Sequence, residues 1–382
     1  MRNNISDNIK ITLLGDLFLG GDYIEEARSK SGDPLAAFNR VLPYLSDTDV
    51  LFVNLEGPIC GGLQIRPNVY SILSNSVDVV DLLSHEHKSV ANLANNHIMD
   101  YGPEGLYKTH SILTSRGIHV LGAGKDIDEA KKAVIIEHGN RNIAFLGFTS
   151  SDRHINAVIA EDGKPGCASY HDVDEIVTRI QELKKESDII CVSLHWGYEY
   201  YLYPSPGQVR IAHALVDAGA NVIIGHHPHV IQGVEKYKNA LILYSLGNIF
   251  FPNFKMVTGR THYPKNITKE FMIATVTINS KMQLEFELTG GKSDSQYSLE
   301  PYPRHVNRAF LQKMDRLSGI ISNPDYEHFW EQYRTSRDRE LIKESIWEAV
   351  TKLRRMPFKD LIRDVRFSDV RRNISRLVKM FS

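Results

Sequence analysis

Three histidines fall within four positions in the stretch Val222–Val230, which reads Val-Ile-Ile-Gly-His-His-Pro-His-Val. The apolar residues before Gly225 predict a short buried strand, and Gly225 is expected to let the chain turn sharply out of it. Pro228 biases His227 toward an extended backbone, in which His227 and His229 would point to the same side. Two imidazoles there favour metal binding, and the alternative is a polar turn with incidental histidines.

Carboxylate, amide and imidazole side chains also follow other predicted strands. Directly after apolar runs come Asp16, Glu56, Asn96 with His97, and His195. Turn chemistry explains one such residue, because Asp and Asn are common turn formers, but it does not explain a series of strand ends. Ligands of α/β sheets bind outside the carboxyl ends of the strands. Oxygen and nitrogen donors without thiolates favour manganese, iron or zinc.

The elements that must position these residues alternate between strand and helix. Strands are predicted at Ile9–Leu14, Val50–Leu55, Ser89–Leu93, His119–Leu121, Ala133–His138, Asn142–Phe148, Ile189–Leu194 and Leu241–Ser245. Helices are predicted at Pro34–Leu45, Val77–Leu83, Gly102–Arg116, Val173–Lys185 and Pro206–Ala218. This alternation predicts a layered α/β fold. Phe271–Ile278 and Met282–Leu288 predict an antiparallel hairpin, and helices are expected from about Arg304.

Composition narrows the class of protein. The 382 residues are 42% hydrophobic and 24% charged, which is ordinary for a globular chain. A net charge of -1 gives no electrostatic footprint for nucleic acid, so no nucleic-acid partner is expected. Cys60, Cys167 and Cys191 are too few and too widely separated for a disulfide framework. No signal peptide or transmembrane-length apolar run is found, so a cytoplasmic location is expected.

The motifs form an ordered series along the chain. They are GD at Gly15, NLE at Asn54, NNHIMDYG at Asn95, HWGYEY at His195, GHHPHV at Gly225 and YSLGN at Tyr244. The series resembles the bacterial capsule-synthesis protein CapA family, named for poly-γ-glutamate capsule synthesis and similar to calcineurin-like metallophosphoesterases. The resemblance covers about residues 9–290. It implies a calcineurin-like layered β-sheet sandwich flanked by helices, in residues 1–300, followed by a helical carboxyl-terminal extension in residues 301–382.

The resemblance also implies a site for two divalent metal ions, Mn, Fe or Zn. Glu56 would bridge the ions, which would bind a phosphoryl group and activate water. The implied ligands of the first metal are Asp16, Glu56 and His229, and those of the second are Glu56, Asn96, His195 and His227.

A further residue, His97, would lie beside the metals and protonate the leaving group. Two features depart from the metallophosphoesterase pattern, although CapA-like proteins share both. Phe18 stands where the usual Asp-x-His motif has its histidine, and Glu56 stands where aspartate is usual. Because Phe18 removes an imidazole, the second metal is expected to have the better-equipped site.

Four further residues and the segment Tyr198–Tyr201 belong to or adjoin the motifs, and all but Trp196 have two interpretations. His226 is expected to shape its turn or support a ligand, and Trp196 to pack as a wall of the site. Asp100 either positions the expected acid or caps a helix, and Asn248 either caps a segment or orients a ligand. The residues Tyr198–Tyr201 line a substrate groove or form an exposed loop.

Three functions fit these features. The first is a metal-dependent hydrolase of an anionic or phosphorylated substrate, linked to capsule or polyglutamate polymer metabolism. The second is a non-catalytic or weakly catalytic component of a poly-γ-glutamate synthesis assembly, and the third is hydrolysis or transfer at an amide. His97 favours an enzyme, because a purely structural metal site would not need it. No other cofactor is expected. The sequence is compatible with a homo-oligomer.

The carboxyl-terminal tail is basic. Residues Lys352–Ser382 hold ten Lys or Arg and three Asp, and Val370–Met380 has an apolar side. Such a segment either docks on its own domain or a twin subunit, or lies on an anionic membrane surface. Docking is the interpretation that we favour.

Deletion of residues 352–382 tests the tail. If the tail docks, the deletion exposes apolar surface, lowers the melting temperature and promotes aggregation. Salt-sensitive sedimentation of the full chain with anionic vesicles would contradict docking, if the deletion abolished it at an unchanged melting temperature.

Overall fold

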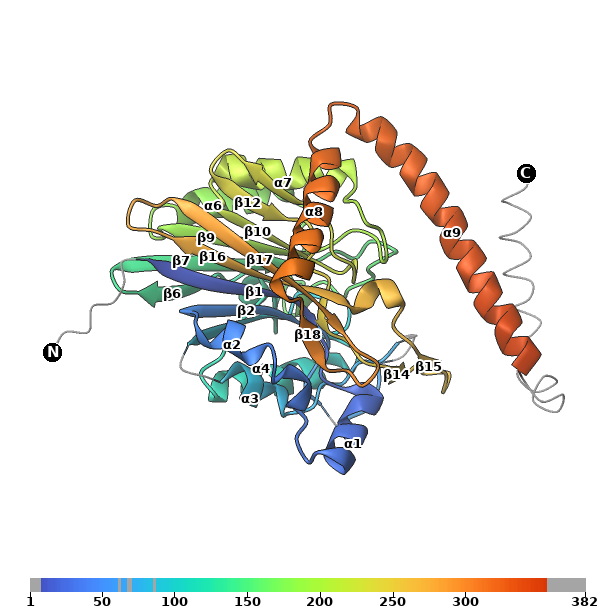
Figure 1. Cartoon of the computed structure of the whole chain (residues 1–382). Helices are drawn as coiled ribbons and strands as arrows, with labels where there is room; N and C mark the ends of the chain where they lie inside the picture. Colours follow the sequence, from blue (N-terminus) through green and yellow to red (C-terminus); the bar gives the residue numbers. More distant parts are fainter. Residues whose placement is uncertain (1–7, 61–62, 67–70, 85–86, 356–382) are drawn as a thin grey trace. The chain divides into compact units, whose positions relative to one another are not determined.

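The computed structural model describes residues 8–60, 63–66, 71–84 and 87–355 (Figure 1). The chain divides into two compact units, residues 1–323 and 324–382. The long helix α9 (Tyr326–Arg355) belongs to the second unit. The domain boundary expected from the sequence, between residues 300 and 301, stays a prediction. Most of the basic tail, residues 356–382, lies outside the described residues.

The first sheet has eight strands within the described part of the chain. Its parallel half consists of β1 (Ile9–Leu17), β2 (Val50–Leu55), β3 (Lys88–Asn92), β4 (His119–Leu121) and β13 (Asn248–Phe250). On the other side of β1 lie the antiparallel strands β16 (Glu270–Ile278), β17 (Leu284–Ser293) and β18 (Leu299–Pro301). The hairpin predicted from the sequence is the pair β16 and β17.

The second sheet has six strands in the same described residues. In order across the sheet they are β11 (Val234–Tyr237), β12 (Ala240–Leu243), β10 (Val222–His226), β9 (Ile189–His195), β7 (Arg141–Phe148) and β6 (Val134–His138). The four central strands are parallel, and the two edge strands are antiparallel to their neighbours. Its central strands therefore end at one edge of the sheet, as in the parallel half of the first sheet.

The two sheets face each other across an apolar core. Along β1 and β2 alternate residues such as Ile11 and Phe52 point into this core, and Phe145 and Ile224 approach from the second sheet. The rings of Phe52 and Phe145 stack with centroids 5.6 Å apart. Burying each such side chain stabilises the fold by about 1.5–3 kcal/mol, so the strand alternation fixes how the sheets face each other.

Helices cover the outer faces of both sheets, which gives the layered sandwich that the family resemblance implies (Figure 1). On the first sheet lie α1 (Gly21–Lys30), α2 (Leu42–Ser46), α3 (Val79–Leu83) and α4 (Gly102–Ser115). On the second lie α6 (Val173–Leu183) and α7 (Pro206–Ala218). The remaining short elements are α5 (Ile127–Ala130), β5 (Ala123–Gly124), β8 (Gly166–Cys167), β14 (Phe254–Lys255) and β15 (Thr261–His262).

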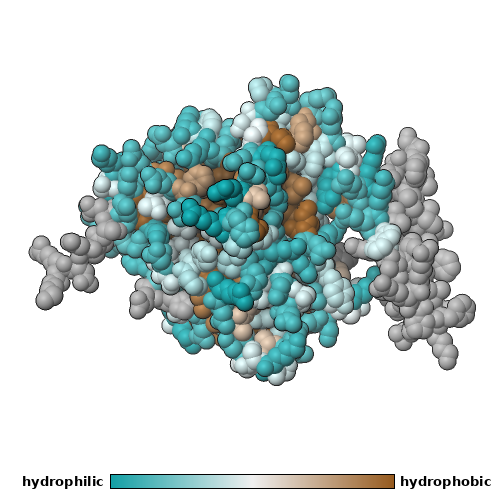
Figure 2. Space-filling model, in the orientation of Figure 1, coloured by the Kyte–Doolittle hydropathy of each residue, from teal (hydrophilic) through white to brown (hydrophobic). Residues whose placement is uncertain are grey.

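The helix α8 (Arg304–Ile321) closes one end of the core between the sheets, because Phe310, Met314 and Leu317 pack into it. The face drawn in Figure 2 is mainly hydrophilic, with separate hydrophobic areas. No helix in the described ranges is both long enough and apolar enough to cross a membrane.

Two sequence predictions need correction. The single helix predicted at Pro34–Leu45 is instead a 3-10 turn at Ala36–Phe38 followed by α2. Pro43 lies in the first turn of α2, where its missing N–H is tolerated, so the helix begins there rather than earlier. Gly225 does not turn the chain out of its strand, because it lies inside β10. A Cβ at Gly225 would lie 1.9 Å from the carbonyl oxygen of Tyr244, so glycine permits a close backbone approach.

Replacing Gly225 by alanine tests this packing. The added methyl would overlap backbone that is itself held by a 3.0 Å hydrogen bond from Trp196 Nε1 to the Tyr244 carbonyl. We expect Gly225→Ala to lower the free energy of unfolding by about 1–3 kcal/mol or more in a denaturant titration. Gly207→Ala is the control, since its Cβ would meet only Ser205 Oγ at 3.7 Å. Equal stability of the two variants would contradict the packing argument.

Candidate metal centre

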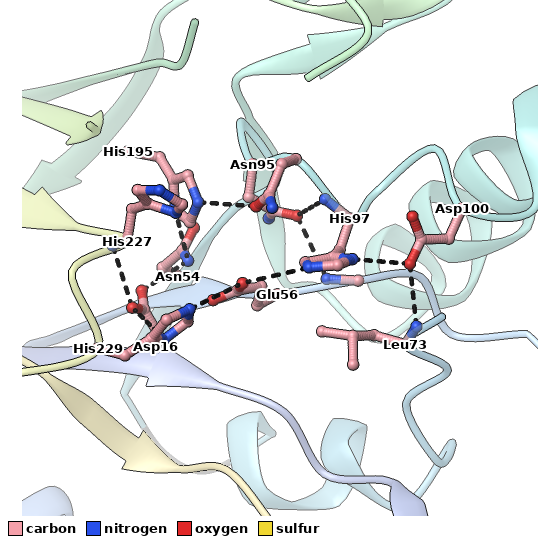
Figure 3. Close-up of polar contacts among 12 residues, drawn as sticks. Asp16, Asn54, Glu56, Leu73, Asn95, His97, Asp100, His195, His227 and His229 are labelled. Carbon is pink, nitrogen blue, oxygen red and sulfur yellow. Dashed lines mark hydrogen bonds and ion pairs between the residues drawn. The ribbon is translucent and has the colours of Figure 1, made fainter. Parts of the chain in front are cut away.

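The strand ends of both sheets meet at one place, and the seven predicted site residues all lie there (Figure 3). Asp16 lies near the end of β1, Glu56 follows β2, and Asn96 and His97 follow β3. From the second sheet, His195 ends β9, and His227 and His229 follow β10. The sequence implied one row of strand ends, and the structure supplies two rows that face each other.

Asp16 is fully buried and contacts both sheets. Its Oδ1 accepts a 2.8 Å hydrogen bond from Asn54 Nδ2, and its Oδ2 accepts one of 3.1 Å from the backbone N–H of His227. His226 Nδ1 lies 3.2 Å from Oδ1. Burial alone would raise the pKa of Asp16, but His226, His229 and the His227 N–H outweigh it, so the pKa lies below its ordinary value. Asp16 is therefore an anion here.

Glu56 is also fully buried, yet neither of its carboxylate oxygens has a hydrogen-bond partner among the described residues. Its Oε1 lies 3.7 Å from His229 Nε2 and 4.0 Å from His97 Nε2. Burial, followed by the charges of Asp16, Glu199 and Asp100, raises the pKa of Glu56 well above its ordinary value. A cation beside this oxygen would remove that penalty.

His195 and Asn96 are joined by a 2.9 Å contact between His195 Nε2 and Asn96 Oδ1. The other ring nitrogen of His195, Nδ1, lies 3.4 Å from Asn54 Nδ2. Burial and the neighbouring imidazoles hold the pKa of His195 well below its ordinary value. The ring is therefore neutral at pH 7, as a metal ligand must be.

His227 and His229 come together in a way that the sequence did not predict. Both have a left-handed backbone, with φ of 93° and 56°, so the segment is not extended and the alternation argument is wrong. A tertiary hydrogen bond outweighs the proline bias, because the His227 N–H turns inward to the Asp16 carboxylate. Both ring nitrogens of His227 lack a partner among the described residues, and burial lowers its pKa to about 4.

Two neighbouring side chains, Asn248 and Phe251, contact the ring of His229. Its Nδ1 lies 2.8 Å from Asn248 Oδ1, which resolves the two interpretations of Asn248 in favour of orienting a histidine. Phe251 meets the same ring edge-on at 5.0 Å. Phe18 is buried against Phe251 and Phe254, with ring centroids 5.2 and 6.0 Å away, and so fills an apolar cluster.

His97 is half-buried beside Glu56 and is fixed by a carboxylate. Its Nδ1 lies 2.8 Å from Asp100 Oδ2, which also accepts the backbone N–H of Leu73 at 2.9 Å. Burial would lower the pKa of His97, but the charge and hydrogen bond of Asp100 raise it above its ordinary value. Tyr101, without a side-chain cap, is the N-cap of α4, so Asp100 positions the histidine rather than capping the helix.

Two other expectations hold. Trp196 packs as expected, since it is fully buried and stacks on Tyr244 with ring centroids 6.2 Å apart, and its place as a wall of the site stays a prediction. His226 is buried against Phe52 and contacts Asp16, which is the supporting role expected for it.

Sequence reasoning missed two supporting asparagines and one glutamate. Asn92 Nδ2 donates to Asn54 Oδ1 at 2.9 Å, and Asn54 donates to Asp16, so a hydrogen-bonded row crosses β3, β2 and β1. The signal was available, because each asparagine stands at or next to the end of a predicted strand. Glu199 lies within 4.8 Å of ring nitrogens of His227 and His229, measured from one carboxylate oxygen. Nothing in the loop motif marked it as nearer to the site than the adjacent tyrosines.

The donor set fits divalent metal ions. Fully buried carboxylate oxygens of Glu56 and ring nitrogens of His227 have no partner among the described residues. Such atoms are costly to bury unless a cation or hydrogen bond compensates them. The groups are carboxylate, amide and imidazole, which suit manganese, iron or zinc.

Comparisons with known proteins agree with the motif series. Residues 10–253 match the family described as bacterial capsule synthesis protein PGA_cap. The chain is 33% identical over 260 residues to the capsule biosynthesis protein CapA of Bacillus anthracis, a match that covers 66% of this chain and 62% of that protein. It is 32% identical over 280 residues to the PGA biosynthesis protein CapA of Bacillus subtilis, with 72% of each chain covered.

Among solved structures, a phosphatase from Mycoplasma pneumoniae is 13% identical, with 81% of this chain and 99% of that chain covered at a TM-score of 0.40. A likeness at this level decides nothing about activity. The family match spans well over half of the chain, and the relatives are identical at about one residue in three. The chain therefore belongs to the bacterial capsule synthesis protein family PGA_cap, as its ordered motifs indicate.

Proposed function

We propose that this protein is a metal-dependent hydrolase that acts on a phosphoester and serves capsule or polyglutamate polymer metabolism. The observation that carries the proposal is that two features occur together at the edge where the strands of both sheets end. Glu56 and His227 present buried atoms that lack partners within the described ranges, and a separate histidine, His97, is held beside them by Asp100. The first feature suits metal binding, and the second suits proton transfer.

In this proposal the six predicted ligands keep their roles. The first metal would be held by Asp16, Glu56 and His229, and the second by Glu56, Asn96, His195 and His227. When bound, divalent metals supply Lewis acidity toward a phosphoryl group and make water a nucleophile at neutral pH. Asn96 contributes a neutral oxygen, so it adds no negative charge where an anionic substrate would bind.

The proposed acid is His97, for reasons of geometry and charge. Asp100 occupies Nδ1, which leaves Nε2 facing Glu56 at 4.0 Å. Because Asp100 raises the pKa of His97, the imidazole stays protonated at a higher pH than a free histidine. It is then able to donate a proton from Nε2 to a leaving group.

Access to the site supports a reaction with an external substrate. Asn96 and His97 are half-buried, whereas Asp16, Glu56 and His195 are fully buried behind them. A substrate would therefore approach past the proposed acid to reach the more deeply buried ligands. Low water access strengthens electrostatic interactions with a phosphoryl group.

The second candidate is a non-catalytic or weakly catalytic component of a polymer synthesis assembly. The names of the two Bacillus relatives favour it, because they refer to biosynthesis of a capsule or of PGA. In that role the metal site would organise the loops or bind an anionic polymer. The two candidates differ in whether His97 matters once metal is bound.

Substituting His97 and His227 separates the acid from a ligand. His227→Ala should lose bound metal, and with it the stabilisation that metal gives the folded state. His97→Ala should keep its metal and lose about 10²–10⁴-fold in turnover of alkyl phosphates under Mn²⁺. The loss should be smaller for nitrophenyl esters, whose leaving groups need no protonation.

An equal loss for both kinds of ester would contradict the acid role. If the metal-loaded wild-type protein turned over no phosphoester, the assembly role would replace the proposed hydrolase.

A second substitution tests the support of His229. Asn248→Leu removes the oxygen that lies 2.8 Å from His229 Nδ1, while keeping the side chain similar in size. We expect Mn²⁺ affinity to fall by about 10–100-fold, the usual effect of losing a group that orients a metal-bound histidine. Calorimetric titration measures it, and unchanged affinity would mean that Asn248 has no such role.

A further inference from the structure

An additional carboxylate reaches the candidate metal centre from the loop after β9. One oxygen of Glu199 and one ring nitrogen each of His227 and His229 all lie within 4.8 Å of one another. Glu199 is exposed, whereas the two histidines are buried. Glu199 thus extends the donor set from its buried part to the surface.

The loop that carries Glu199 is tied to the histidine segment on both sides. Before it, the Trp196 N–H donates to the His226 carbonyl at 3.0 Å. After it, the Tyr200 N–H donates to the Pro228 carbonyl at 2.8 Å. These backbone bonds bracket Glu199 and hold its carboxylate near His227 and His229, so the proximity follows from the fold of the loop.

Potential metal-binding atoms of Glu199 and of the neighbouring His227 have no hydrogen-bond partner among the described residues. Both ring nitrogens of His227 are buried without a partner, and the Glu199 carboxylate makes no hydrogen bond or ion pair, in the part of the chain that the structure describes. A fully buried imidazole with both nitrogens unpaired among the described residues is a costly arrangement, which a bound group would relieve. A divalent cation beside Glu199 would have a carboxylate oxygen and imidazole nitrogens within reach, which are groups that such metals bind.

Phe18 leaves a place in the ligand set that the Glu199 carboxylate is able to take. At the position where an imidazole is usual, Phe18 packs into the cluster with Phe251 and Phe254, so it offers nothing to a metal. Phe251 in turn lies against His229. The side of His229 toward Phe251 is therefore apolar, and any further donor must come from another direction.

We propose that Glu199 is a further ligand of the first metal, which it binds together with His229 and beside the second-metal ligand His227, and that it makes up for the imidazole that is absent at Phe18. This inference rests on the proposed metal-dependent function. It adds a seventh protein ligand, which lies in a loop that contributes none of the six ligands implied by the family resemblance.

The test is a Mn²⁺ titration of the chelator-treated full chain by calorimetry, with thermal unfolding as a second readout. Glu199→Gln keeps the size of the side chain and removes its charge. We expect its Mn²⁺ affinity to fall by about tenfold or more, with a smaller Mn²⁺-dependent rise in melting temperature. Glu199→Asp, which keeps the carboxylate, should recover part of the affinity.

Two controls separate ligation from a general charge effect. Glu25→Gln removes the same charge from the exposed face of α1 and should bind Mn²⁺ like the wild type. The titrations are repeated in 1 M KCl, where attraction between exposed charges is screened over about 3 Å. A ligand bond survives this screening, so the difference between Glu199→Gln and the wild type should persist.

Wild-type affinity in Glu199→Gln, or a difference that disappears in 1 M KCl, would overturn the inference and leave the proposed function standing. Failure of the wild type to bind Mn²⁺, Fe²⁺ or Zn²⁺ would overturn both. The two failures are therefore distinguishable in one series of titrations.

Discussion

The buried carboxylate of Asp16 is the interaction on which the site depends, because it joins the two sheets. It accepts one hydrogen bond from Asn54 in its own sheet and another from the backbone of His227, which follows a strand of the other sheet. An unpaired carboxylate would be very costly at this depth. These bonds therefore fix how the two rows of strand ends meet, and the other candidate ligands take their places around that contact.

The charge balance of the site explains why a cation suits it. Asp16 is stabilised as an anion by its neighbours, but the carboxylate oxygens of Glu56 accept no hydrogen bond from the residues that the structure describes. The pKa of Glu56 is raised well above its ordinary value by burial first and then by nearby carboxylates. His227 and His195 are held neutral by burial. The protein thus keeps one carboxylate uncompensated next to neutral imidazoles, which is an arrangement that a divalent metal completes.

Much of this arrangement was predictable from the sequence. Apolar runs located β1, β2, β9 and β10, and the polar residues just after them are the ones that meet at the site. The pairing of two sheets was implied only by the resemblance, because strand periodicity does not reveal which strands share a sheet. The orphaned atoms of Glu56 also could not be predicted, since they depend on what is absent around a buried side chain.

The failures of prediction lie where local backbone rules lose to tertiary contacts. His227 precedes a proline, yet it adopts a positive φ because its N–H is drawn to Asp16. Gly225 is needed for the approach of Tyr244 rather than for a turn. The loop that carries Glu199 lies near the histidines because the backbones of Trp196 and Tyr200 donate hydrogen bonds to His226 and Pro228, residues far along the chain. Each case depends on a neighbour that sequence spacing does not identify.

The central claim is that these strand ends form a metal centre. Diffraction from crystals grown with Mn²⁺, measured at the manganese absorption edge, tests it most directly. The account predicts two anomalous peaks at this edge of the sheets, one contacting Asp16, Glu56 and His229 and the other contacting Glu56, Asn96, His195 and His227. A map with no anomalous peak among these residues would contradict it.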